Sequence, residues 1–68
     1  MTATFLNKYF DGIYNYYDLS FEEEGEVLLR LNGVIFEGEP TTEEEETRAR
    51  EIALNNLPDY ELVEIITL

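Results

Sequence analysis

A two-residue hydrophobic period runs from residue 13 to residue 39 and predicts β-strands in the middle of the chain. Alternate residues of its first part share one apolar side, which comprises Ile13, Tyr17, Leu19 and Phe21. Asn15 is the polar exception on this side. Turn-forming residues at 23–25 and 32–33 interrupt the period, so it predicts three strands, at 13–22, 26–31 and 34–39.

Two turn signals predict how these strands pair. Glu-Glu-Gly at 23–25 suits a three-residue hairpin loop whose glycine takes the left-handed conformation, and this loop sets Leu19 opposite Leu29. Asn32-Gly33 favours a two-residue type I′ turn, which sets Leu29 opposite Phe36. Both turns place the same apolar residues on one face, so the sequence predicts an antiparallel three-stranded meander.

Two helices and a fourth strand complete the expected fold. Four large residues near the start have the spacing of one helix face: Phe5, Leu6, Tyr9 and Phe10. They predict a helix at 3–11, although the same aromatic residues are compatible with a strand. Thr41 and Thr42 are both suitable N-caps with a glutamate three residues later, which predicts a helix at 42–56 with a capping box. The β-branched segment 59–67 predicts the last strand. We therefore expect one α+β domain over residues 1–68, in the order α-β-β-β-α-β.

Charge pairs and a buried stripe are expected around the second helix. Its apolar stripe consists of Ala49, Ile52, Ala53 and Leu57. Three opposite-charge pairs are predicted: Glu44 with Arg48, Glu46 with Arg50 and, across the sheet, Asp18 with Arg30.

The chain is strongly acidic, with 16 Asp and Glu, 4 Lys and Arg, and a net charge of −12. Nucleic acid and anionic membranes attract basic surfaces, so we expect neither as a direct partner. The chain has no Cys and no His, which argues against a disulfide framework and an ordinary zinc site. The first ten residues lack the basic and apolar parts of a signal peptide, and no segment has the length of a membrane span. These features predict a cytoplasmic protein.

The predicted register gathers most of the acids at one end of the molecule. The third strand would return toward the loop at 23–25, and the second helix would begin there. Ten glutamates should then form one acidic pole: Glu22, Glu23, Glu24, Glu26, Glu37, Glu39, Glu43, Glu44, Glu45 and Glu46. The predicted register sets Glu22 opposite Glu26 and Glu26 opposite Glu39, and directly opposed like charges destabilise a sheet. Helix capping accounts only for the last four glutamates. The alternative is a solvated face that only keeps the protein soluble.

The sequence contains no catalytic motif. General acid–base catalysis needs two carboxylates in unlike environments within a cleft, and a chain of this length with exposed acids is not expected to provide one. The calcium-loop spacing is absent. We therefore expect no enzyme activity, no catalytic residues, no metal site and no cofactor.

A nucleic-acid mimic accounts for most of these features. Carboxylates two apart on a strand or four apart on a helix are separated by about 6 Å, which approaches the spacing of successive phosphates. In size, charge and helix–meander–helix order, the chain resembles small acidic phage-encoded inhibitors, such as anti-CRISPR and anti-restriction proteins. The resemblance implies that the acids occlude a basic nucleic-acid-binding site on a nuclease, a CRISPR effector, a restriction enzyme or a polymerase. It assigns no role to any single residue.

The alternative function is a small interaction module. Four apolar or aromatic residues are predicted on the outward face of the sheet: Tyr14, Tyr16, Leu28 and Ile35. They would form a partner surface or a homodimer contact, with tyrosine as the anchor and the acids serving solubility. Cover by the first helix or the last strand would instead make them structural.

Overall fold

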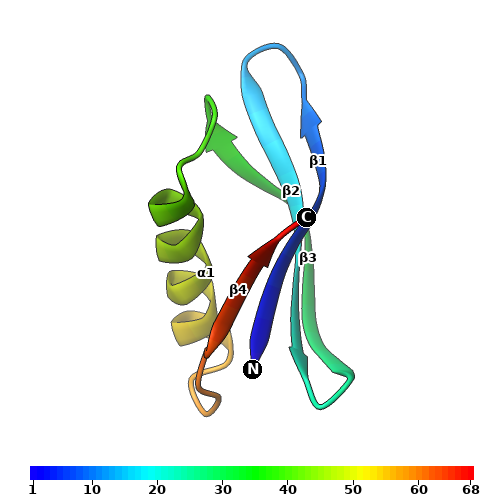
Figure 1. Ribbon diagram of the computed structural model, residues 1–68, viewed down its shortest axis with the longest axis vertical. Helices are drawn as coiled ribbons and strands as arrows, with labels where there is room; N and C mark the ends of the chain where they lie inside the picture. Colours follow the sequence, from blue (N-terminus) through cyan, green and yellow to red (C-terminus); the bar gives the residue numbers. More distant parts are fainter.

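The computed structural model describes all 68 residues and contains one mixed four-stranded sheet and one helix (Figure 1). The elements are β1 (Thr2–Phe10), β2 (Tyr14–Glu23), β3 (Glu26–Glu37), α1 (Thr42–Asn56) and β4 (Glu64–Thr67). The strand order is β3-β2-β1-β4. β2 is antiparallel to β1 and β3, and β4 is parallel to β1. The predicted α+β class is therefore confirmed, with one helix instead of two.

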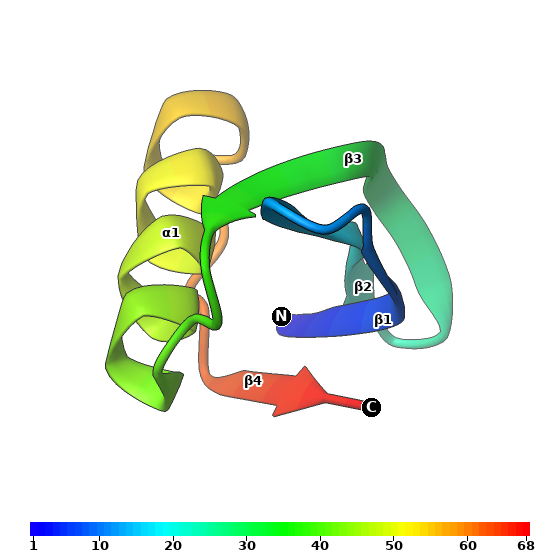
Figure 2. The same ribbon diagram turned by 90° about the horizontal axis from the view of Figure 1, so that it is seen from above.

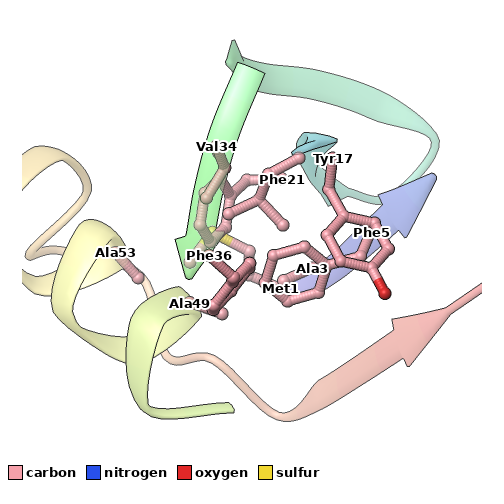
Figure 3. Packing of buried hydrophobic residues seen from close by; sticks show 10 residues of the cluster. Met1, Ala3, Phe5, Tyr17, Phe21, Val34, Phe36, Ala49 and Ala53 are labelled. Atoms are coloured by element: carbon pink, nitrogen blue, oxygen red, sulfur yellow. The ribbon is translucent and has the colours of Figure 1, made fainter. Parts of the chain in front are cut away.

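The sheet is curled, and α1 covers its concave side. Figure 2 shows the strands wrapping around a centre that α1 closes from the open side, between β3 and β4. The buried apolar residues fill this space and come from β1, β2, β3 and α1: Met1, Ala3, Phe5, Tyr17, Leu19, Phe21, Val34, Phe36, Ala49 and Ala53 (Figure 3). Phe5, Tyr17 and Phe36 meet edge to face, with ring centroids 5.3–6.0 Å apart. Such aromatic pairs add about 0.5–1.5 kcal/mol each beyond their buried area.

The predicted helix at 3–11 is wrong, because these residues form β1. β1 lies between β2 and β4, so both neighbours satisfy its backbone groups. Ala3 and Phe5 point inward with the period of a strand. A register shift between Leu6 and Tyr9, with Asn7 at φ 56°, then breaks that period. This bulge produces the apparent helical spacing of the aromatic residues.

The predicted hairpin at Asn32-Gly33 is also wrong. β3 continues through these residues, so the predicted strands 26–31 and 34–39 belong mainly to one strand. Leu31 pairs with Leu19 and Val34 with Tyr17, which leaves Asn32 and Gly33 together opposite a single residue of β2. Gly33 has φ 76°, a left-handed conformation that glycine adopts without strain. Leu31 and Val34 are three residues apart, a spacing that would place them on opposite faces of a regular strand. Either a two-residue turn or a one-residue bulge brings them to the same face, so the sequence pattern fits both.

The turn between β2 and β3 contains two residues, not three. Glu24 and Gly25 have φ angles of 49° and 80°. A type I′ turn has positive φ at both central residues, so these angles match it. Glu23 and Glu26 are therefore the residues that face each other across the turn, whereas Glu22 faces Val27. The predicted rows of Glu22 with Glu26 and of Glu26 with Glu39 do not form.

The helix agrees with its prediction in both bounds and capping. The Thr41 Oγ1 accepts from the Glu44 amide at 3.1 Å, and the Glu44 carboxylate accepts from the Thr41 amide at 3.2 Å. Ala49 and Ala53 are buried, and Ile52 and Leu57 pack beside them. The predicted last strand at 59–67 is shorter than expected, since only Glu64–Thr67 pairs with β1.

Candidate binding surface

The structure divides the ten predicted site glutamates into two groups, one at the β2–β3 turn and one that runs from the far end of β3 to the first turns of α1, near the middle of the molecule (Figure 1). β3 runs the full length of the sheet without reversing, so it carries its last residues away from the β2–β3 turn (Figure 1). The turn group comprises Glu22, Glu23, Glu24 and Glu26. The helix group comprises Glu37, Glu39, Glu43, Glu44, Glu45 and Glu46. The longest extent of the molecule is 36 Å. The single acidic pole is therefore a wrong prediction, caused by the wrong turn at 32–33.

The turn group is only partly neutralised. The N-terminal ammonium of Met1 lies 2.9 Å from Glu23. No Lys or Arg pairs with the other three members. Glu64 of β4 and Glu22 of β2 flank Thr2 in register, so they stand two strands apart, about 10 Å, on the outward face. Glu64 thus extends this group. The sequence prediction missed it because the position of the last strand in the sheet was unknown.

The helix group is less uniform than the sequence indicates. Glu39 pairs with Lys8, and Glu44 caps the helix. Glu45 is buried on the inward side of α1, where it accepts a hydrogen bond from the Thr67 hydroxyl at 3.4 Å, so it does not belong to the surface. Burial raises the pKa of Tyr17 to about 12, and the neighbouring Glu45 carboxylate adds to this shift. Glu37, Glu43 and Glu46 are exposed and have no cationic partner.

The arginines of α1 do not neutralise the helix glutamates. Neither Glu44–Arg48 nor Glu46–Arg50 forms an ion pair. Arg48 instead donates to the backbone oxygen of Ile35 at 2.8 Å and lies 4.6 Å from the centre of the Phe36 ring. Arg50 reaches the backbone oxygen of Leu62 at 3.5 Å. Arg48 therefore holds the helix against β3, Arg50 makes a weaker contact with the segment before β4, and neither compensates the carboxylates of α1.

The predicted pair of Asp18 and Arg30 does form, at 3.4 Å, although Arg30 stands in register with Ser20 and reaches Asp18 diagonally. Hydrogen bonds from Asn7 and then from Arg30 hold the pKa of Asp18 below its ordinary value.

No group of three or more Asp and Glu residues is arranged to hold a metal ion.

Three of the four predicted sheet-face residues come together. Tyr16 of β2 stands between Tyr9 of β1 and Ile35 of β3, and the two tyrosine rings lie 6.1 Å apart. Tyr9, Tyr16 and Ile35 form the tyrosine face. Tyr14 pairs in register with Glu37, so this face borders the helix group. Leu28 lies far away, beside the β2–β3 turn, and packs partly against the core. The sequence prediction missed Tyr9, because it placed that residue on a helix.

Asp11 orders the β1–β2 hairpin beside the tyrosine face. Its carboxylate accepts from the amides of Ile13 and Tyr14, at 2.9 and 2.7 Å, and from the Tyr16 hydroxyl at 2.7 Å. The Tyr14 amide, followed by the Tyr16 hydroxyl, holds the pKa of Asp11 below its ordinary value. The same hydrogen bond raises the pKa of Tyr16.

Comparison with protein-family models, curated proteins and solved structures finds no match to this chain. The one helix is too short and too polar to cross a membrane.

Proposed function

We propose that this chain is an acidic binding protein that mimics nucleic acid and occludes a basic nucleic-acid-binding site on a partner protein. The uncompensated charge along the molecule supports this proposal most directly. An extent of 36 Å and a net charge of −12 correspond to one net negative charge for every 3 Å of length. A single DNA strand carries one charge for about every 3.4 Å. A basic groove that fits a nucleic-acid strand would therefore meet a similar charge density here.

The use of the arginines gives independent support. A chain selected only for solubility could keep Glu44–Arg48 and Glu46–Arg50 as surface pairs, because such pairs cost little. Here Arg48 and Arg50 hold α1 in place, and Glu43 and Glu46 remain free for a partner.

The placement of the charge determines the kind of groove. The turn group lies at one end and the helix group extends from the middle toward the other end, so the partner site would run along the molecule. A socket for one end would meet only one of the two groups. Nucleases, CRISPR effectors, restriction enzymes and polymerases have such elongated basic channels and are the partner classes we propose. A phage-encoded inhibitor is the kind of protein that would use this surface.

Competition with nucleic acid tests this function. The immobilised protein should capture its partner from nuclease-treated bacterial lysate at about 50 mM salt and release much of it at about 200 mM. Added duplex DNA or RNA should displace the same captured protein. Capture that is insensitive to salt and to both nucleic acids would overturn the mimic function, even if a stable complex forms.

The tyrosine face supports a second candidate function. Tyr9 and Ile35 are 60% and 46% exposed although they flank Tyr16 on a sheet, where a monomer would favour polar residues. Tyrosine is enriched in the energetic centres of protein interfaces. In this case a partner protein or a second copy of the chain would dock on Tyr9, Tyr16 and Ile35. Replacement of Tyr16 and Ile35 by alanine would then abolish binding or dimerisation.

A further inference from the structure

One buried oxygen near the β1–β2 hairpin has no hydrogen-bond partner. Asn15 occupies an inward position of β2, in line with Tyr17 and Leu19, and is 2% exposed. Its Nδ2 donates to the backbone oxygen of Gly38 at 2.7 Å. Its Oδ1 is the one buried side-chain nitrogen or oxygen in the molecule without a partner. Native proteins satisfy nearly all such atoms, so an apolar residue would be the simpler choice at this inward position.

The unpartnered oxygen belongs to a residue that lines a pocket of about 330 Å³. The pocket lies between the β1–β2 hairpin and the segment that follows β3. Its lining consists of Lys8, Phe10, Ile13, Asn15, Gly38 and Glu39. Phe10 and Ile13 are 58% and 67% exposed, so they provide apolar walls that the core does not use.

Lys8 and Glu39 form an ion pair on the exposed side of this pocket. The Lys8 ammonium shows that a cation binds against Glu39 at this place. Exposed pairs of this kind are weak and exchange readily with competing charges. Because the Oδ1 of Asn15 is closed to solvent in the isolated protein, a ligand must move a neighbouring side chain to reach it. Lys8 and Glu39 are the charged neighbours that can move at little cost.

We propose that this pocket binds one arginine side chain of the partner protein. The guanidinium would replace the Lys8 ammonium at Glu39 and donate to the Oδ1 of Asn15. Its aliphatic stem would contact Phe10 and Ile13. Arginine fits because it offers five donors in a planar fork, whereas both protein groups that face it only accept. The inference rests on the proposed function, since a basic partner supplies the arginine.

A titration of the isotope-labelled full chain with N-acetyl-arginine methylamide tests the pocket by NMR. The side-chain amide of Asn15 and the backbone amides of Gly38 and Glu39 should shift and saturate. The matched citrulline derivative has nearly the same shape without the charge and should leave them unchanged. Lys8→Gln removes the internal competitor and should tighten binding up to about fivefold, whereas Glu39→Gln should weaken it by a similar factor.

Asn15→Leu removes the acceptor and should abolish the saturable shifts. If this variant does not fold, the two surface variants at Lys8 and Glu39 decide the question alone. Equal shifts with arginine and citrulline, or shifts spread over all exposed glutamates without saturation, would overturn the proposal. So would a long-lived water at the Asn15 side chain that persists at saturating arginine derivative, because a structural water alone would then satisfy Oδ1.

The titration contains no partner protein, so its outcome is separable from that of the capture experiment. Arginine binding without any salt-sensitive capture would leave the pocket in place and overturn the proposed function. Salt-sensitive capture that survives Asn15→Leu, without arginine binding, would do the reverse.

Discussion

Arg48 and Arg50 lie on α1, but their contacts are with neighbouring segments of the fold. Arg48 stacks on Phe36 and donates to the backbone oxygen of Ile35, at the edge of β3. Arg50 makes only one long hydrogen bond, of 3.5 Å, to Leu62. Individual side chains thus determine which glutamates stay uncompensated, because a guanidinium that packs against the fold is not available for an ion pair.

Arg48→Ala should lower the free energy of unfolding by about 1 kcal/mol, since it removes a cation–π contact and a hydrogen bond to the backbone. Arg50→Ala is the matched control and should lower it by clearly less. Urea denaturation of both variants provides the comparison. An equal loss in the two variants would contradict the role assigned to Arg48.

The Asp11 carboxyl should titrate below its ordinary pKa of 3.8, because three hydrogen bonds favour its charged form. A folded-state pKa below the unfolded value stabilises the hairpin fully above about pH 4. That stabilisation is lost as the pH falls through the lower folded value. An NMR titration of the Ile13 and Tyr14 amides reports it. A midpoint at or above 3.8 would show that the carboxylate does not hold the hairpin.

At the level of whole elements, two of the bulges explain the two largest errors of the sequence prediction, the helix at 3–11 and the hairpin at 32–33. The helix is specified locally, by the capping residues at 41 and 44 and by its own apolar stripe, and its bounds were predictable. The bulge near Asn7 and the bulge at Asn32-Gly33 depend on pairing with β2, which no local pattern encodes. The bulge near Asn7 gives the large residues of β1 the spacing of a helix face. The bulge at Asn32-Gly33 has the sequence that is typical of a two-residue hairpin turn.

The same bulges explain the errors at the candidate site. The composition predicted an acidic surface, but its location depends on strand direction. One wrong turn moved six glutamates to the wrong end. Tyr14, Tyr16 and Ile35 keep the outward side that the sequence predicts, because each holds it whether residues 32–33 form a turn or a bulge.

Deletion of Gly33 should leave the chain folded. It removes the extra residue of the bulge, so Leu31 and Val34 then stand two residues apart and Val34 and Phe36 keep their inward positions opposite β2. Gly33→Ala keeps the chain length and should cost only about 1–2 kcal/mol, from strain at φ 76°. Circular dichroism melts compare the two variants. Unfolding of the deletion variant would contradict the bulge, because a two-residue turn at 32–33 cannot lose one of its residues.

For the molecule as a whole, charge repulsion opposes the compact state. A net charge of −12 with three ion pairs predicts that added salt raises the melting temperature, through screening.

Two single substitutions locate this repulsion. Glu26→Lys should stabilise the protein by about 0.2–1 kcal/mol, because residue 26 faces Glu23 across the turn. Glu39→Lys should destabilise it slightly, because Glu39 already pairs with Lys8. Thermal melts at low salt separate the two signs. Stabilisation by both substitutions would mean that net charge alone decides stability.

Partner binding by two charge-reversal variants tests most directly whether the uncompensated glutamates are the binding surface. One variant changes Glu22, Glu24 and Glu26 to lysine, and the other changes Glu37, Glu43 and Glu46. Each substitution changes the net charge by +2, so both variants have a net charge of −6, and a difference between them reports the position of the charge and not its total. We expect each variant to weaken partner binding by about tenfold or more at low salt, while Tyr16→Ala with Ile35→Ala changes it little. Tight binding by both triple variants, lost only in the Tyr16 and Ile35 variant, would contradict the mimic and assign the contact to the tyrosine face.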